Sequence, residues 1–312
     1  MLWPRVWEVF KSLGLEDDLV KRLHEGGWPP KGGTVALASE KSDMREGVPF
    51  FNLIPEDAHD VLLKHITPAT RFHLSSRLVS YKDAGMHIEL LFKDGRTATC
   101  DLLVGADGIN SGVRKTLLSG SKPESEVIKK INLDHPALKG GMVYYGRDRA
   151  SYTYWDAAQW TSGGREVAQC LVKNMDRPSK WAIQAVTPLD NYVEGRIALL
   201  GDAALGMRPH LGNGAGQAFE DLPFDASILS NTIAKSVQPG KVDIPKILET
   251  YKAIRQPFGS FVARETRNTG LLYELTDAVG FEGIREGDTV SSERLAKLGK
   301  EINEEWAWSC IR

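Results

Sequence analysis

Two apolar segments of similar design constrain the fold most strongly, since each runs directly into glycines, an aspartate and a helical pattern. The first is LLVGADG at residues 102–108, and the second is IALLGDAA at residues 197–204. A continuous apolar run that ends at glycine is typical of a buried strand. Buried strands that run into glycine-rich turns and then helices favour an α/β protein. Open α/β sheets bind their ligands at the carboxyl ends of such strands.

The rest of the chain divides into blocks with different patterns. Composition turns aromatic and strand-like from about residue 120 to 190, which predicts a second sheet, and the chain from about residue 243 has a helical pattern. The other expected elements are helices over 6–13, 16–23 and from Pro55, a strand within 34–53, and antiparallel strands over 72–83 and 86–101 that turn at 84–85 and 94–95.

Charge and composition exclude several classes of partner. The 312 residues carry 39 Lys and Arg against 41 Asp and Glu, a balance that gives no electrostatic case for nucleic acid. No apolar run approaches the roughly 20 residues that span a bilayer, and Arg5, Glu8 and Lys11 interrupt the apolar N-terminus, which therefore predicts no signal peptide. The three cysteines are far apart, which predicts neither a disulfide framework nor a metal site. These features favour a cytoplasmic enzyme without a transmembrane segment, and they say nothing of its oligomeric state.

The first apolar segment ends in a motif, GADGINSGVR, whose residue types suit close backbone contact with a ligand. Gly108 allows the backbone to approach a bound group, and Asp107 stands just beyond the strand. Ser111 is placed to cap the next helix, and Arg114 lies one turn inside it. A strand, turn and helix with a capping aspartate and no ligand is the alternative interpretation.

The second motif, GDAALGMRPHLGNGAGQAFED, starts with Gly201 and Asp202 at the end of its strand. Pro209 restricts the loop, and glycines 212, 214 and 216 then lead into a helix. The N-terminus of a helix offers unpaired N–H groups and the positive end of a dipole, which suit an anion or an electron-rich ring edge.

Together the two motifs resemble the C-terminal fingerprints of the FAD-dependent aromatic hydroxylases, the single-component flavin monooxygenases, with the salicylate-hydroxylase-like group common in fungi as the nearest type. The resemblance implies an α/β fold in which a doubly wound FAD-binding domain is interleaved with a substrate-binding sheet. It assigns residues 1–120 and 190–270 to the FAD domain, 34–54 and 121–189 to the substrate sheet, and 271–312 to C-terminal helices.

The resemblance also implies the chemistry. The family binds FAD, reduces it with NAD(P)H and uses O₂ to insert one oxygen atom into an electron-rich ring, so the expected partners are a small aromatic or polyketide-like substrate and O₂. By resemblance, Asp107 holds the ribityl–pyrophosphate region and the nicotinamide donor, Asp202 the ribityl chain, and Pro209 lies against the reactive edge of the ring. No catalytic residue and no metal ligand is assigned. The predicted cofactor-binding residues are Asp107, Gly108, Arg114, Gly201, Asp202, Pro209, Gly212, Gly214, Ala215 and Gly216.

The sequence departs from the family pattern in three places. The family opens with a GxGxxG unit that grips the ADP half of FAD, and here the match starts after it, so we expect an N-terminally truncated FAD domain. Pro55 stands where the family has a flavin-contacting Arg, and Leu205 where it has a His. These departures leave two alternatives to a monooxygenase: a non-redox relative that binds or isomerises a small molecule, or an incomplete, inactive fragment.

Overall fold

The computed structural model describes nine segments of a chain that mixes helices with strands, as expected for an α/β protein. The described residues are 4–25, 55–119, 127–130, 142–145, 153–155, 179–182, 184–221, 242–273 and 289–311. The strand expected within 34–53 lies outside them.

The described residues of the N-terminal part form three helices, α1 (Pro4–Ser12), α2 (Glu16–Glu25) and α3 (Pro55–Lys64). The predicted helices are confirmed, and Gly14 ends α1 in a left-handed conformation at φ 71°. Val6 and Phe10 are buried with residues of α2 and α3, whereas Leu13, expected on the same apolar face, is 51% exposed. Leu13 follows the last helical residue, so the turn carries it away from the stripe. The Phe10 ring meets Phe219 edge to face with centroids 4.9 Å apart, which attaches these helices to the second motif.

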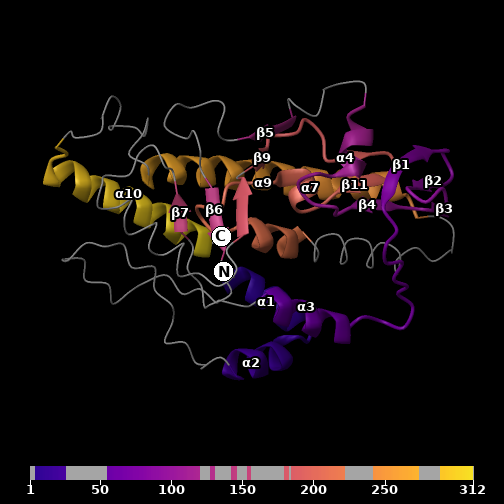
Figure 1. Ribbon diagram of the computed structural model, residues 1–312, viewed down its shortest axis with the longest axis horizontal. Coiled ribbons are helices and arrows are strands. Elements are labelled where there is room, and N and C mark those ends of the chain that lie inside the picture. The colour runs from indigo at the N-terminus through magenta and orange to yellow at the C-terminus, as the bar shows by residue number, and fades with distance from the viewer. Residues whose placement is uncertain are drawn as a thin grey trace.

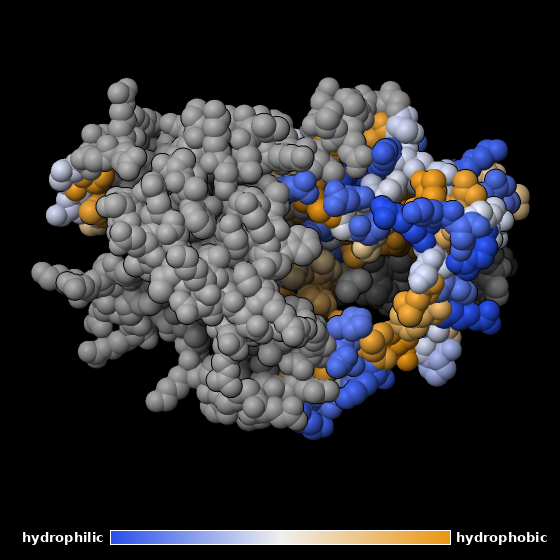
Figure 2. Space-filling view, viewed as in Figure 1, coloured by the Kyte–Doolittle hydropathy of each residue, from blue (hydrophilic) through white to orange (hydrophobic). Residues whose placement is uncertain are grey.

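An antiparallel sheet follows, with strands β1 (Leu78–Asp83), β2 (Ile88–Phe92) and β3 (Thr97–Cys100) in that order. Both predicted turns are confirmed, and each contains a glycine, Gly85 or Gly95, at φ 84°. The first strand is shorter than predicted, because residues 72–77 turn at Ser75 (φ 57°) before β1 begins. Large apolar side chains are exposed on this sheet and on the segment before it; they are Phe72, Leu74, Val79, Met86 and Leu91. Figure 2 shows a mixed hydrophilic and hydrophobic surface at the right, where Figure 1 draws β1, β2 and β3.

The two apolar segments form adjacent strands of one sheet, ordered β10 (Val193–Glu194), β11 (Ile197–Leu199) and β4 (Leu103–Gly105). Strands β4 and β11 pair in parallel, with Leu103 opposite Ile197 and Gly105 opposite Leu199. Strand β11 is wholly buried, but Val104 of β4 is 40% exposed, so the expectation of two fully buried strands is wrong for β4 within the described residues. Because the strands are parallel and in register, both motifs emerge at the same edge of the sheet.

In the region predicted as a second sheet, the residues that the structure describes form five short strands. They are β5 (Ile128–Lys130), β6 (Met142–Tyr145), β7 (Thr153–Trp155), β8 (Ser179–Ala182) and β9 (Gln184–Val186). Strands β6, β7 and β8 form a sheet in the order β7-β6-β8, and β5 pairs with β9. The N–H of Val186 in β9 donates to the carbonyl of Gly206 across 2.7 Å, which joins β9 to the second motif.

Two helices predicted for the C-terminal part are present in its described residues, α9 (Ile244–Tyr273) and α10 (Ser292–Ile311). Helix α9 runs lengthwise through the molecule past α7 and β11, and α10 packs against it (Figure 1). Tyr251 of α9 is buried and donates a hydrogen bond from its hydroxyl to the carbonyl of Leu199 across 2.8 Å. Among the described helices, none combines the length and the apolar character that crossing a membrane requires.

Candidate functional site

The ends of β4 and β11 bring the two sequence motifs into contact. Helix α4 (Gly112–Leu117) follows β4, and the one-turn helix α7 (Asp202–Leu205) follows β11. Helix α7 was not predicted from the sequence. The N–H of Leu200 donates to the carbonyl of Gly105 across 3.0 Å, so the strands stay paired up to the residue before Gly201. The two motifs thus form one candidate site at the edge where α/β sheets bind ligands.

Asp107 lies at the surface and caps α4. Its carboxylate accepts hydrogen bonds from the hydroxyl of Ser111 and from the N–H groups of Gly112 (2.7 Å) and Val113 (3.2 Å). Gly108 has φ 77°, and a side chain there would meet no atom within 4 Å. The described contacts therefore show that Asp107 caps helix α4, as in the alternative interpretation of the first motif. The cofactor contact implied by resemblance stays a prediction, for which the exposed carboxylate and the open space beside Gly108 leave room.

Arg114 is buried beneath both motifs, with 1% of its surface exposed. Its guanidinium donates to the carbonyl of Ala203 across 2.8 Å, to that of Ile109, and to that of Asp202 across a longer 3.5 Å. A direct contact of Arg114 with a cofactor stays a prediction. Its described bonds to carbonyls of both motifs give it a structural role in holding their loops together.

Asp202 starts α7 and its carboxylate reaches solvent. The surrounding protein atoms displace enough water to raise the pKa of this carboxyl above its usual range. Gly201 before it has φ 57°, and a side chain there would lie 3.2 Å from Cβ of Ala218. The close approach of the helix that begins at residue 214 therefore requires glycine at 201.

The loop after α7 ends at the predicted helix, which runs over 214–221 in the described residues. Pro209 and Ala215 are exposed, Gly212 has φ 62°, and a side chain at Gly214 would point into open space. Within the described part of the chain, the side-chain amide of the fully buried Asn213 has no hydrogen-bond partner for either its nitrogen or its oxygen. The first-turn N–H groups have no carbonyl inside the helix to bond, so this end is suited to an electron-rich group.

These features fit the isoalloxazine and ribityl half of FAD. Open space borders Gly108 and Gly214, which is the room a flat ring needs beside the backbone. The Asp202 carboxylate can accept hydrogen bonds from ribityl hydroxyls, and the N-terminus of helix 214–221 can stabilise negative charge on the ring.

The two departures from the family pattern have different surroundings. Leu205, in place of His, is 7% exposed and belongs to the main core. A side chain at Gly259 of α9 would lie only 2.6 Å from Cδ2 of Leu205, so this leucine and α9 pack closely. Pro55 is the first residue of α3.

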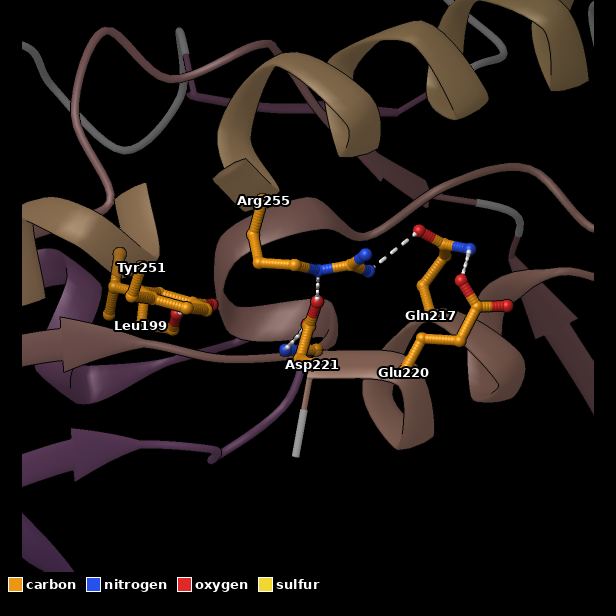
Figure 3. A network of polar contacts seen from close by, with 7 residues as sticks. Leu199, Gln217, Glu220, Asp221, Tyr251 and Arg255 are labelled. Atoms are coloured by element: carbon orange, nitrogen blue, oxygen red, sulfur yellow. Dashed lines mark hydrogen bonds and ion pairs between the residues drawn. The ribbon is translucent and has the colours of Figure 1, made fainter. Parts of the chain in front are cut away.

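Sequence reasoning missed the buried polar residues that support the second motif from behind. Arg255 of α9 is 5% exposed and pairs with Asp221, and Gln217 joins them (Figure 3). The available signal was the spacing on α9: Tyr251, Arg255 and Val262 fall on one helical face, which makes Arg255 a charge within a buried stripe.

A mixed α/β fold that presents two glycine-rich turns and a helix N-terminus at one sheet edge defines the class of proteins that bind nucleotide-containing cofactors. No family model matches the chain. Two salicylate hydroxylases of Pseudomonas putida are similar to it: one is 27% identical over 310 residues, covering 81% of this chain and 68% of the relative. The other is 30% identical over 279 residues, covering 72% of this chain and 63% of the relative.

Two further comparisons agree. The 6-methylsalicylate 1-monooxygenase atA of Aspergillus terreus is 29% identical over 232 residues, covering 59% of this chain and 51% of that relative. A solved salicylate hydroxylase substrate complex superposes with a TM-score of 0.59 and 26% identity over 82% of this chain and 72% of that one. The homologues of this chain are thus salicylate hydroxylase-like FAD-dependent monooxygenases, including a fungal one. The chain spans about two thirds or less of the length of these three relatives.

Proposed function

We propose that this chain is an FAD-dependent monooxygenase that hydroxylates a small aromatic or polyketide-like substrate with NAD(P)H and O₂. The observation that carries the proposal is that the paired strands β4 and β11 bring both motifs to one sheet edge, where Asp202 follows β11 and helix 214–221 lies against Gly201 through Ala218. Relatives named salicylate hydroxylase and 6-methylsalicylate 1-monooxygenase support a phenolic acid as the substrate class.

The proposal extends to the organisation of the chain. A doubly wound FAD domain comprises residues 1–120 and 190–270, a substrate sheet 34–54 and 121–189, and C-terminal helices 271–312. The strands observed between 128 and 186, and the parallel pair β4 and β11, support this division. We place the enzyme in the cytoplasm, where NAD(P)H is available.

When bound, FAD supplies the redox chemistry with O₂, and the chain supplies the site. In this proposal Asp202 binds and orients the ribityl chain, and the N–H groups of Gly214, Ala215 and Gly216 stabilise negative charge on the reduced ring. Pro209 limits how closely a substrate approaches the ring. Asp107 and Gly108 of the first motif line the space for FAD opposite the second motif. Gly201, Gly212 and Arg114 keep the loops of the two motifs in shape.

A titration of the purified chain with FAD tests the proposal, with binding measured as fluorescence quenching. We expect saturable binding that Asp202→Asn weakens at least tenfold, while Asp60→Asn, an equally conservative change at an exposed position of α3, leaves it unchanged. The flavin-loaded chain should then oxidise NADH or NADPH faster with salicylate or 6-methylsalicylate present, and ¹⁸O₂ should label the product. Tight binding of a phenolic acid without flavin would instead favour the non-redox alternative, and binding of neither would favour the inactive fragment.

A further inference from the structure

Helix α9 reaches the second motif through a chain of buried polar contacts. Arg255 donates from Nε to Oδ1 of Asp221 across 2.5 Å and from Nη2 to Oε1 of Gln217 across 3.1 Å. Gln217 in turn donates to Oε2 of Glu220 across 3.2 Å. Figure 3 shows Arg255 extending from α9 between Asp221 and Gln217, both of which belong to helix 214–221.

The same contacts continue to the residue that precedes Asp202. The N–H of Gly201 lies 3.4 Å from Oδ2 of Asp221, so the carboxylate that binds Arg255 also meets the backbone at the end of β11. On the other side of Asp202, the carbonyl of Ala203 accepts the hydrogen bond from Arg114. The residues on both sides of Asp202 are therefore held by buried charged groups, one on α4 and one at the end of the helix that α9 supports.

Stability alone does not account for an ion pair at this place. Arg255 is 5% exposed and Asp221 7% exposed, so both ions have lost most of their water. Apolar residues of similar volume at such positions are often as stable as a buried pair or more so. The pair does what apolar packing does not: it offers a directed acceptor to the N–H of Gly201, whose φ of 57° sets the direction in which Asp202 leaves the strand.

We infer that Arg255 is a positioning residue for Asp202, acting through Asp221 and the N–H of Gly201. The inference rests on the proposed function in one respect, that the ligand of Asp202 is the flavin. Arg255 orients the Asp221 carboxylate, the carboxylate holds the backbone at Gly201, and Asp202 is thereby kept in the orientation that binds the ribityl chain.

Three variants test this role. Arg255→Met keeps most of the side-chain volume and removes the donors, whereas Arg255→Lys keeps the charge and is the conservative variant. Val262→Ala is the matched control, because Val262 is fully buried on the same helix and takes no part in the described polar contacts of Arg255 and Asp221. Two quantities are measured for each: hydrogen exchange of the backbone over 199–206 in the flavin-free protein, and the dissociation constant for FAD.

We expect Arg255→Met to speed exchange over 199–206 and to raise the FAD dissociation constant, each at least tenfold relative to Val262→Ala, and Arg255→Lys to restore part of both. Exchange and affinity within twofold of the Val262→Ala values would overturn the inference, as would faster exchange with unchanged affinity. If the unaltered chain binds no FAD, the proposed function fails, and the exchange measurement still decides whether Arg255 holds this segment. Should Arg255→Met not fold, Asp221→Asn, which keeps shape and one acceptor oxygen, is measured in its place with the same expected changes.

Discussion

Arg114 donates a hydrogen bond to the carbonyl oxygen of Ala203 across 2.8 Å, so a side chain of the first motif closes the loop of the second. The two residues are 89 positions apart in sequence. Because Arg114 also binds the carbonyl of Ile109 in its own motif, one guanidinium sets the relative position of the two turns. Neither motif therefore keeps its geometry independently of the other.

Replacing Arg114 should be costly for that reason. Arg114→Met leaves the carbonyls of Ile109 and Ala203 without this donor, and we expect a loss of about 2–4 kcal/mol in the free energy of unfolding. Arg114→Lys keeps the charge without the planar fork and should lose about 1–2 kcal/mol. Urea unfolding with a constant m-value measures both.

Arg196 offers a matched control for Arg114, since it also binds two carbonyls, those of Gly85 and Asp101, but it is only half-buried and both hydrogen bonds are exposed to water. Water replaces the lost donors there, so Arg196→Met should cost less than about 1 kcal/mol. Equal losses for Arg114→Met and Arg196→Met would contradict the role assigned to burial.

Asp107 allows its capping role to be separated from the cofactor role implied by resemblance. Asp107→Ala removes the acceptor for the N–H groups of Gly112 and Val113 and should cost about 1 kcal/mol of unfolding free energy. Asp107→Asn keeps a side-chain oxygen and should cost less than half of that. If Asp107 also holds FAD, Asp107→Asn weakens FAD binding several-fold while stability barely changes. Ser111→Ala, which removes a cap without changing charge, serves as control and should leave the affinity unaltered.

Local pattern was sufficient to predict the elements that carry the site. The turns at Gly85 and Gly95, the helix that begins at residue 214 and the strands β4 and β11 follow from glycine placement and apolar runs. The buried polar residues behind the second motif were not predicted, because the pairing of Arg255 with Asp221 depends on how α9 packs against the rest of the fold. The apolar runs also could not show that Val104 would be exposed, since burial depends on what packs against each face.

Helix α9 also approaches the second motif at Gly270, where side-chain volume should be critical. A Cβ at Gly270 would lie 2.4 Å from Nε2 of His210, so Gly270→Ala should lower the free energy of unfolding by about 1–3 kcal/mol through overpacking. Gly299→Ala, in α10 with no atom within 4 Å, should instead raise it by about 0.5–1 kcal/mol. Thermal unfolding of both variants measures the contrast. Combining Gly270→Ala with His210→Ala should recover part of the loss, and additive losses would show that the ring is not the obstacle.

His210 should make the stability of the chain depend on pH. Desolvation, and to a smaller degree the positive charge of Arg208, lower the pKa of His210 from 6.5 to about 3. The folded protein keeps the His210 ring neutral at pH values where the unfolded chain takes up a proton. The contribution of the neutral ring to the free energy of unfolding is therefore complete above about pH 7.5. It is lost as the pH falls from about 6.5 toward 3, by up to about 1.4 kcal/mol per pH unit.

The aspartates near the site act in the opposite direction. Desolvation raises the pKa of Asp202 and, against the opposing effect of Arg255, that of Asp221, so both take up protons in the folded protein before they do so unfolded. Their contribution to stability therefore rises as the pH falls. The difference between the chain and His210→Gln isolates the histidine, because the variant keeps both aspartates. Urea unfolding between pH 4.5 and 8 should show the unaltered chain losing stability relative to His210→Gln below about pH 6.5. Parallel pH profiles for the two proteins would mean that His210 is not held neutral against α9.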